Sequence, residues 1–353
     1  MKLGIIGLPQ TGKTTIFNAL TRQNQPTTMS GKIEVHTAVI NVPDPRIIQL
    51  AQLYHPKKVT FAKVEYADVA GLEGRGQGDI SGQLRNELGK MDGFIHVVRC
   101  FESGSVPHTA GSLDPARDIV SMNTELLLND LITVEHKLER LSEDRGKGGR
   151  DKAEIEKEKE LFSRLQEHLS GDQPLRMMQL SGEDVKSLSG YQFLTLKPML
   201  VVLNLGEGQD APDVASAAGD LPVIPLQGKL EMELAQLPLE EIDLFLSEYG
   251  IAEPSLNRMI RESYDLLGLQ SFFTVGEDEV RSWPLKAGYT AQQAAGVIHT
   301  DLARGFIRAE VAPYNLLVES KSLSALRDQG KLQVEGKNYI VRDGDIVHVR
   351  FNV

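Results

Sequence analysis

The chain has 353 residues, of which 41% are hydrophobic and 25% charged, and this length suits two or three globular domains. Its net charge of −11, from 38 basic and 49 acidic residues, argues against broad, non-specific coating of nucleic acid but is compatible with a local basic face. No apolar run approaches the length of a membrane span, and the lone Cys100 excludes an internal disulfide. We therefore expect a cytoplasmic protein without membrane association.

A phosphate-binding motif stands at the start of the chain. The apolar run at 3–6 predicts a buried strand, residues 7–14 (GLPQTGKT) fit the G-x-x-x-x-G-K-[ST] loop, and residues 15–20 begin a helical pattern. Glycines in the loop let backbone N–H groups face an anion, and the helix N-terminus adds its positive dipole end. We expect Lys13 to contact the β- and γ-phosphates and Thr14 to ligate Mg²⁺. The expected phosphate-binding residues in this segment are Gly7, Pro9, Gln10, Thr11, Gly12, Lys13, Thr14 and Thr15.

A second motif, Asp68-Val69-Ala70-Gly71, ends a strand-like run that begins at Lys63. In P-loop NTPases an Asp at this place holds Mg²⁺, so we expect Asp68 to bind the metal and the Gly71 N–H to face the γ-phosphate. The alternative is an ordinary Asp-x-x-Gly turn. The next residue, Leu72, stands where Ras-like GTPases use a Gln to orient water, and leucine cannot hydrogen-bond. Another group must then position the water, or turnover is slow.

A candidate base-recognition motif, residues 204–207, follows an apolar strand at 198–203, where guanine-specific proteins carry Asn-Lys-x-Asp. Here Glu207 replaces the Asp that accepts from guanine, and Leu205 replaces the Lys whose stem packs on the base. A guanine donor left unpaired costs about 1–3 kcal/mol. Adenine lacks the 2-amino group, and its N6 amine can donate to Asn204 or to a backbone carbonyl, so the motif favours ATP. The alternative is that residues 204–207 form a turn away from the base.

Two helices are expected between these motifs. Apolar residues at three- and four-residue steps give the first helix a coiled-coil seam at Leu131, Val134, Leu138 and Leu141. A polar, glycine-rich turn at 145–150 follows. The second helix has its apolar stripe at Ile155, Phe162, Leu165 and Leu169. This pattern predicts an antiparallel helical hairpin.

The C-terminal part changes character again. Residues 290–293 (TAQQ) form a capping box that predicts a helix whose inward-facing residues are Ala294, Val297, Ile298 and Leu302. The runs at 332–334 and 339–341 flank a turn sequence, EGKN, and predict a hairpin. A last strand is expected at 346–351. A small mixed sheet holding one helix suits a β-grasp domain.

These patterns predict an α/β protein of three parts. Residues 1–125 and 196–269 form a P-loop NTPase domain with a mainly parallel sheet, residues 126–195 form the inserted helical coiled coil, and residues 270–353 form the β-grasp domain.

The chain resembles the YchF group of Obg-related P-loop proteins, the Obg-like ATPases, over nearly its whole length. The motifs that carry the resemblance are Gly7-Leu8-Pro9, Gly12-Lys13-Thr14, Phe17-Asn18-Ala19-Leu20, Val42-Pro43-Asp44-Pro45-Arg46, Asp68-Val69-Ala70-Gly71-Leu72, His96-Val97-Val98-Arg99-Cys100-Phe101, Asn204-x-x-Glu207, residues 294–301 and 305–310, and Phe351-Asn352-Val353. The resemblance implies an ATPase-type domain interrupted by a helical hairpin and followed by a ubiquitin-like TGS domain. It also implies association with the ribosome or ribosomal RNA and a role in translation or stress regulation.

A catalytic histidine is also implied by the resemblance. The family lacks the Gln at the Leu72 position, and a histidine in the loop after the Arg-Cys-Phe strand is implicated in hydrolysis. His108 matches it by position. Histidine can orient or deprotonate water near neutral pH. The expected catalytic residues are therefore His108 and Lys13.

The chain departs from the family pattern in three segments. Gln10 stands where the family has an Asn that is linked to potassium coordination, so K⁺ dependence is left open. The switch I threonine falls on Lys32, which cannot ligate Mg²⁺. Either Thr27, Thr28 or Ser30 replaces it as a ligand, or Lys32 contacts the phosphate charge, and both alternatives stay open. At the rim of the base site, Gln227 and Gly228 replace a Ser-Ala pair and are the further candidate base contacts.

The expected function is slow Mg²⁺-dependent hydrolysis of ATP to ADP and phosphate. A GTPase is the alternative chemistry, and it would need another group to replace the missing Asp contact. The alternative of a different class is a nucleotide-gated binding module with little hydrolysis, which docks to a ribosome or a protein.

Overall fold

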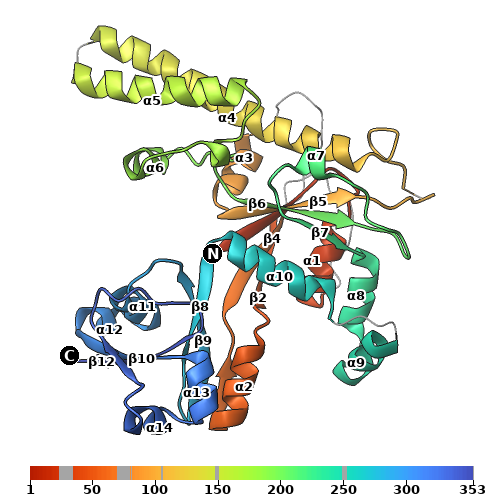
Figure 1. Cartoon of the computed structure of the whole chain (residues 1–353). Helices are drawn as coiled ribbons and strands as arrows, with labels where there is room; N and C mark the ends of the chain where they lie inside the picture. Colours follow the sequence, from red (N-terminus) through yellow and green to blue (C-terminus); the bar gives the residue numbers. More distant parts are fainter. Residues whose placement is uncertain are drawn as a thin grey trace. The chain divides into compact units, whose positions relative to one another are not determined.

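The computed structural model describes residues 1–23, 35–69, 80, 82–104, 106–147, 151–248 and 253–352 (Figure 1). The chain divides into two compact units. The first unit comprises Met1–Ala38 and Glu65–Leu256, and the second comprises Val39–Val64 and Asn257–Val353.

A six-stranded sheet of order β2-β4-β1-β5-β6-β7 forms the centre of the first unit. Its strands are β1 (Lys2–Ile6), β2 (Val35–Asn41), β4 (Lys63–Val69), β5 (Gly93–Arg99), β6 (Met199–Asn204) and β7 (Val223–Leu226). The pairs β1–β4, β1–β5, β5–β6 and β6–β7 are all parallel. This confirms the predicted α/β class with a mainly parallel sheet. Parallel strands bring their carboxyl ends to one edge, where ligands of such folds bind.

The first unit also contains the shorter helices α1 (Lys13–Thr21), α3 (Gly82–Gly89), α7 (Ala215–Ala218), α8 (Gly228–Gln236) and α9 (Leu239–Glu248). Helices α1 and α8 pack against each other. On the sheet itself, Ile6 of β1 shares one apolar cluster with Met122 and Leu126, and Val201 of β6 shares another with Ile119. The start of the long helix α4 (Pro115–Lys147) is thus buried on the sheet.

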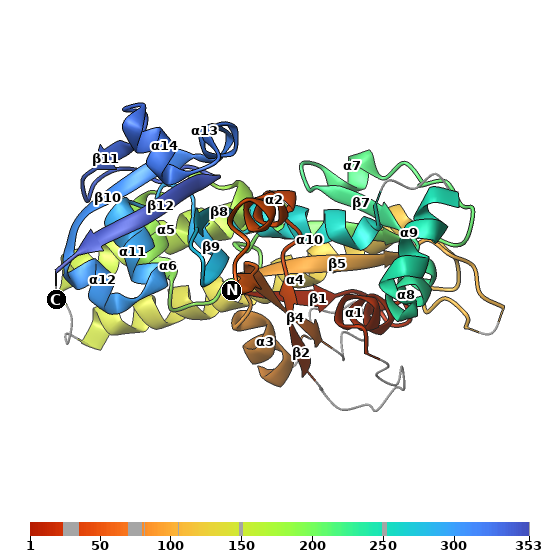
Figure 2. The same cartoon turned by 90° about the horizontal axis from the view of Figure 1, so that it is seen from below.

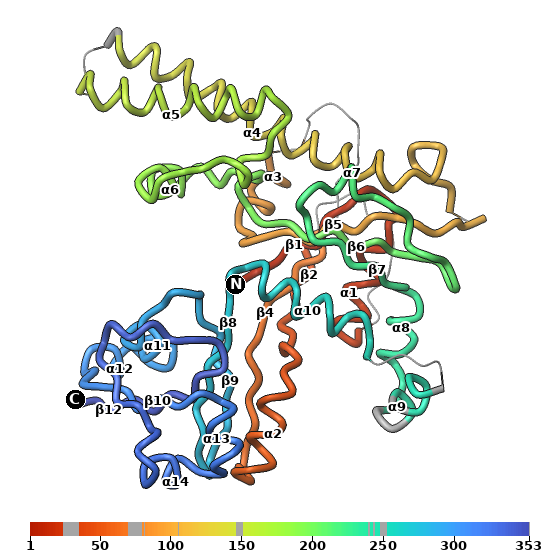
Figure 3. Tube along the Cα trace, in the orientation of Figure 1, coloured from red at the N-terminus to blue at the C-terminus, as the bar shows by residue number. Residues whose placement is uncertain are grey.

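The rest of α4 pairs with α5 (Lys152–Ser170) as the predicted helical hairpin (Figure 3). The predicted seams meet in one cluster, where Val134 packs with Phe162, Leu165 and Leu169. The chain then returns to β6 through a short 3₁₀ turn, η1 (Leu175–Met177), and α6 (Gly182–Leu188). Thr195 and the backbone N–H of Leu194 donate to the buried Asp130 carboxylate, which joins the returning segment to α4.

The second unit is built on another six-stranded sheet, of order β11-β10-β12-β8-β9-β3. Its strands are β3 (Lys58–Thr60), β8 (Leu269–Thr274), β9 (Glu279–Lys286), β10 (Phe306–Pro313), β11 (Gln333–Glu335) and β12 (Asp345–Phe351). Helices α11 (Ala291–Ile298) and α12 (Thr300–Arg304) lie on one side of β10 and β12, and α13 (Tyr314–Ser320) and α14 (Leu323–Asp328) lie on the other (Figure 2). The predicted capping box at Thr290 and Gln293 is present at the start of α11.

Two sequence-based expectations for the second unit differ from the structure. The predicted hairpin is wrong, because β11 pairs with β10 while Ile340 bridges to Thr290, beside α11. Burial of Val341 in the α11 cluster draws that segment away from β11. Val297, expected to face inward, is partly exposed.

The division of the chain also differs from the expected boundaries. Residues 39–64 were expected in the NTPase domain, yet they belong to the second unit. The reason is packing: Ile47 and Leu50 of α2 (Pro45–Tyr54) join the cluster around Phe273, and β3 pairs with β9. The boundary after Leu256 falls inside α10 (Ser255–Leu266) rather than at residue 269.

Candidate functional site

The phosphate loop joins β1 to α1, as the motif predicts. Gly12 is the N-cap residue of α1, and no side chain caps the helix, so its first backbone N–H groups have no side-chain acceptor. Gly7 lies against β5, where an added Cβ would come within 2.4 Å of the Val97 carbonyl oxygen. The loop is thus shaped by close backbone packing and leaves donors free for an anion.

Lys13 is the cation of this loop. Its Nζ donates to the carbonyl oxygens of Gly7 and Leu8, at 2.9 and 2.8 Å. Burial lowers the pKa of Lys13 to about 8, against an opposing effect of the Asp68 carboxylate. A phosphate group next to Nζ would favour the charged form, so the side chain already lies where an anion would stabilise it.

Thr14 and Asp68 come together from α1 and β4. The Thr14 hydroxyl donates to Asp68 Oδ2 at 2.8 Å, and Asp68 Oδ1 is buried without a hydrogen-bond partner among the described residues. Burial raises the pKa of Asp68, against the effects of Thr14, Lys13 and His36. A hydroxyl and a carboxylate with an unused oxygen are the hard donors that Mg²⁺ takes in P-loop sites, so this pair fits the ion.

Asn204 connects the phosphate loop to the base side of the site. Its Nδ2 donates to the Thr11 carbonyl oxygen and its Oδ1 accepts from the Gly228 N–H, each at 2.9 Å. An added Cβ would lie 2.2 Å from Asn204 at Gly12, where φ is +92°, and 2.8 Å from it at Gly228. Both glycines are therefore required by the close approach of this amide, which acts as a brace in the structure.

The other expected base contacts differ in exposure. Glu207 lies exposed in the turn after β6. Leu205 is buried, at 9% exposure, in the cluster with Val98 and Cys100. Gln227 is the N-cap residue of α8, directly before Gly228. Roles for Leu205, Glu207 and Gln227 in base binding stay predictions.

The remaining phosphate-loop residues line the same turn. Gln10 adopts a left-handed φ of +64°, and its Oε1 is buried without a partner among the described residues. Thr11 is buried, and its hydroxyl donates to the Leu8 carbonyl oxygen. Pro9 and Thr15 are half-buried. Gly71 and Leu72, like the switch I candidates Thr27, Thr28, Ser30 and Lys32, lie outside the described residues.

His108 lies in the loop between β5 and α4, and both of its ring nitrogens are engaged. Nε2 is 2.9 Å from Asp118 Oδ2, and Nδ1 accepts from the Ala110 N–H at 3.1 Å. Because Nδ1 accepts, the ring proton is on Nε2, which donates to the carboxylate. Among the described residues, these polar contacts join His108 to its own loop and to α4, and none joins it to the phosphate loop.

Sequence reasoning missed the residues that hold this loop. Asp118 is only 1% exposed and also accepts from Arg117. Arg99, at the end of β5, donates to the carbonyl oxygens of Phe101 and Val106 and lies over the Phe101 ring. The available signal was Arg99 itself, a charge within an apolar strand.

Two further groups, one in β5 and one directly after it, are buried. Cys100 has its pKa raised to about 12, first by burial, so it is a thiol and not a nucleophile. His96 is fully buried, burial lowers its pKa to about 3, and its ring nitrogens have no partner among the described residues. It is therefore neutral at physiological pH.

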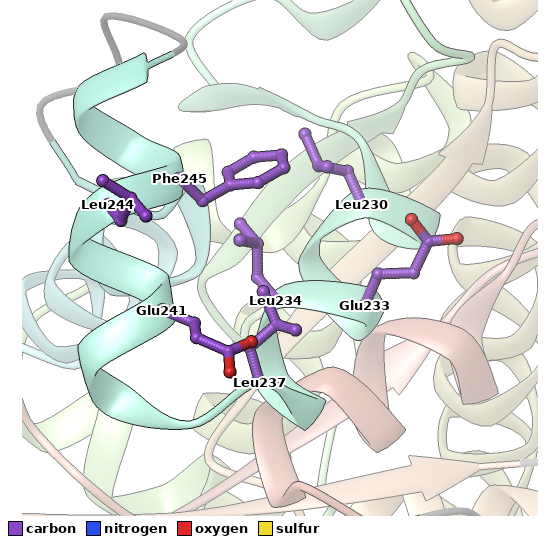
Figure 4. Close-up of a pocket in the computed structure, with 7 residues that line it drawn as sticks. All are labelled: Leu230, Glu233, Leu234, Leu237, Glu241, Leu244 and Phe245. Carbon is purple, nitrogen blue, oxygen red and sulfur yellow. The ribbon is translucent and has the colours of Figure 1, made fainter.

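A separate hollow lies between α8 and α9 (Figure 4). Its volume is about 530 Å³, and its walls are Leu230, Leu234, Leu237, Leu244 and Phe245 with two carboxylates, Glu233 and Glu241. Those walls carry no cation and two negative charges, so this hollow is unsuited to a phosphate. The nucleotide site is assigned by the phosphate loop instead.

Comparisons with known proteins agree with this geometry. Residues 2–137 match the family model MMR_HSR1, described as a 50S ribosome-binding GTPase, and residues 269–352 match YchF-GTPase_C, described as a protein of unknown function (DUF933). The Ribosome-binding ATPase YchF of Pasteurella multocida (strain Pm70) is 40% identical over an alignment 368 positions long, which covers 100% of this chain and 99% of that protein. The protein of the same name from Bacillus subtilis (strain 168) is 38% identical, over 99% of both chains.

A solved structure is similar over the same length. The Schizosaccharomyces pombe YchF GTPase matches with a TM-score of 0.87 at 30% identity, over 99% of this chain and 97% of that one. The names of these relatives differ on the nucleotide: the two bacterial proteins are named ATPases, and the Schizosaccharomyces pombe protein is named a GTPase. Within the described residues, no helix combines the length and the apolar character that crossing a bilayer requires.

Proposed function

This chain belongs to the YchF family, and from that premise we propose that it is a cytoplasmic, ribosome-associated ATPase that regulates translation or stress responses. It binds ATP with Mg²⁺ and hydrolyses it slowly to ADP and phosphate. Relatives carry the name Ribosome-binding ATPase, which supports both halves of the proposal.

The observation that carries the chemistry is the cluster of Lys13, Thr14 and Asp68 at the uncapped start of α1. Backbone N–H groups of the loop and Lys13 bind the phosphates. Thr14 and Asp68 would hold Mg²⁺, which supplies positive charge for the transferring phosphoryl group. Gly71 is proposed to donate its N–H to the γ-phosphate.

The preference for ATP rests on the base side of the site. Glu207 is exposed and has no ion-pair partner among the described residues, so its carboxylate is available at the rim of the base site. It stands in place of a shorter Asp, and Leu205 supplies no lysine stem. The loss of one guanine contact corresponds to roughly 5- to 150-fold in affinity.

His108 is proposed to position or deprotonate the attacking water, since Leu72 cannot. Its engagement with Asp118 and Ala110 means that the loop must rearrange before the imidazole can reach a water molecule at the phosphate loop. Slow turnover follows from that requirement.

The testing experiment is equilibrium competition of ATP, ADP, GTP and GDP against a fluorescent nucleotide, with Mg²⁺ and then with EDTA. We expect adenine nucleotides to compete better and the triphosphate to depend on Mg²⁺. A guanine preference would return the chain to the GTPases, and the absence of any competition would refute nucleotide binding. Repeating the titration in K⁺ and in Na⁺ tests whether the orphan Oε1 of Gln10 contributes to a potassium site.

The second candidate function is a nucleotide-gated binding module with little hydrolysis. It is favoured by the same locked His108 loop. Co-sedimentation with ribosomes in ATP-analogue, ADP and nucleotide-free states tests it. Equal binding in all three states would refute the gate.

A further inference from the structure

The hollow between α8 and α9 is lined by apolar side chains from both helices (Figure 4). Leu230 and Leu234 of α8 and Leu237 directly after it are spaced by four and three residues, so they share one face. Leu244 and Phe245 of α9 form the opposite wall. About 530 Å³ remains between the two walls. The two helices therefore present apolar stripes that they do not fully bury against each other.

Leu244 is the clearest sign that this apolar surface lacks a cover within the chain. Its side chain is 70% exposed, the largest exposed fraction among the large hydrophobic side chains that the structure describes. Leu246 of the same helix, by contrast, is buried. Single exposed apolar residues are common on protein surfaces, but one that forms the wall of an apolar hollow marks a binding surface.

The rim of the hollow is acidic. Glu233 stands on α8 and Glu241 on α9, and the sequence from 228 to 248 holds six acidic residues against one lysine. The Nζ atom of that lysine, Lys229, lies 3.8 Å from Glu233, but both side chains are exposed, so solvent screens the pair. Glu241 has no ion-pair partner among the described residues. Such a rim repels phosphates and anionic membrane surfaces, and it attracts a cationic partner.

We propose that the hollow between α8 and α9 binds a short amphipathic helix of a partner protein, with the apolar stripe of that helix in the hollow and its lysine or arginine residues at the rim. Recognition of a helix in a groove places residues i, i+3 or i+4, and i+7 against the apolar wall. Leu230 and Leu237 are seven positions apart, about 10 Å along a helix, so about two turns of the partner face them. The basic residues of the partner would meet Glu233 and Glu241. This surface is separate from the phosphate loop and adds a protein partner to the proposed function.

The test uses the full-length protein and a fluorescein-labelled peptide of about 18 residues, or about five helical turns, made of leucine and lysine with its leucines on one helical face. A peptide of the same composition in scrambled order removes the stripe. A leucine–glutamate peptide keeps the stripe and reverses the charge. Fluorescence anisotropy should show micromolar binding of the leucine–lysine peptide, and each of the other two should bind about tenfold more weakly or worse.

Leu244→Gln tests the apolar wall. We expect it to weaken binding of the leucine–lysine peptide about tenfold, because the contact of one leucine side chain is lost. Leu244 is already exposed, so its replacement leaves the fold intact. The matched control is Ile132→Gln, which changes an aliphatic residue of α4 that is 42% exposed and lies outside the hollow. This control should bind the peptide as the unaltered protein does.

Glu241→Gln tests the acidic rim. Binding of the leucine–lysine peptide should weaken about threefold at low salt and by less at high salt, since salt screens an exposed carboxylate. Glu135→Gln removes the same charge from an exposed position of α4 and should have no effect. Nucleotide competition should be unchanged in all four variants, because none of them alters the phosphate loop.

Other occupants of the hollow give different results. Equal binding of the scrambled peptide, unchanged binding to Leu244→Gln, or no binding of the leucine–lysine peptide would refute the helix site. Equal binding of the leucine–glutamate peptide would refute a basic partner. A dimer in sedimentation that Leu244→Gln dissociates would assign the hollow to a second copy of this chain. Binding to phosphatidylglycerol vesicles that Leu244→Gln abolishes would assign it to a membrane, and either assignment would overturn the proposal.

Discussion

Two loops follow neighbouring strands, β1 and β5, and they are held in different ways. The phosphate loop is held by backbone packing: Gly7 against Val97, and Gly12 against the Asn204 amide. The His108 loop is held by side chains, through Asp118 and Arg99. The difference teaches that the phosphate-binding loop is built in advance, whereas the loop of the proposed hydrolytic residue is fastened to α4 and would have to be released.

The largest effect is expected at the preformed loop. Lys13→Ala removes a buried cation from the phosphates, and we expect roughly a 100-fold loss of ATP affinity, equivalent to about 3 kcal/mol. Lys229→Ala is the matched control, since Lys229 follows Gly228 at the start of α8 as Lys13 follows Gly12, but its side chain is solvated. Competition titration measures both variants, and wild-type affinity in Lys13→Ala would reject the phosphate-loop assignment.

A different signature is expected at the second loop. His108→Ala should reduce the rate of phosphate release from ATP by about 10- to 100-fold, because water then lacks its positioning base. Nucleotide affinity should not change, since no described contact joins His108 to the phosphate loop. Unaltered turnover would show that His108 is an ordinary loop residue.

Asp118→Asn examines how that loop is held. We expect turnover to rise about threefold, because the contact that holds the imidazole at α4 and away from the phosphate loop is weakened. The control is the double variant with His108→Ala, in which Asp118→Asn should add nothing. A loss of turnover in Asp118→Asn that adds to the loss in His108→Ala would mean that Asp118 acts on folding rather than through His108, and thermal unfolding of the single variant would reveal the same.

The smallest effect concerns His96, between the two loops in β5. Its folded-state pKa of about 3 lies below the ordinary value of 6.5, so only the unfolded chain gains a proton as the pH falls below 6.5. The free energy of unfolding should therefore decrease as the pH is lowered, and this residue contributes a slope of up to about 1.4 kcal/mol per pH unit. Urea unfolding at pH 7 and at pH 5 measures this decrease. In His96→Leu the free energy of unfolding should decrease less between the two pH values than in the unaltered protein.

The control for this effect is His136→Leu, which alters an exposed histidine of α4. The free energy of unfolding of His136→Leu should decrease between pH 7 and pH 5 as much as that of the unaltered protein. An identical decline in His96→Leu would contradict the burial account.

The same contrast explains what the amino-acid sequence could predict. The phosphate loop is local, and parallel strands place Thr14 beside Asp68, so both were predictable from motifs and topology. Asp118 and Arg99 were not, because their role depends on the path of a loop. The hairpin at 332–341 failed for a similar reason: its turn signal was local, whereas burial of Val341 beside α11 decided the pairing.

Domain assignment met the same limit. The segment 39–64 follows the phosphate-loop helix in the chain and carries no break in composition. Its assignment to the second unit depends on where Ile47 and Leu50 are buried and on the pairing of β3 with β9. Contacts of this kind join distant parts of the sequence and leave no local pattern.

The most direct test of the whole account is phosphate release from ATP and from GTP by the purified chain in Mg²⁺, with Lys13→Ala as the blank. We predict slow release from ATP above the blank, weaker release from GTP, and none from either after EDTA. Release that is equal in the blank, or faster from GTP than from ATP, would contradict the proposal of a Mg²⁺-dependent ATPase.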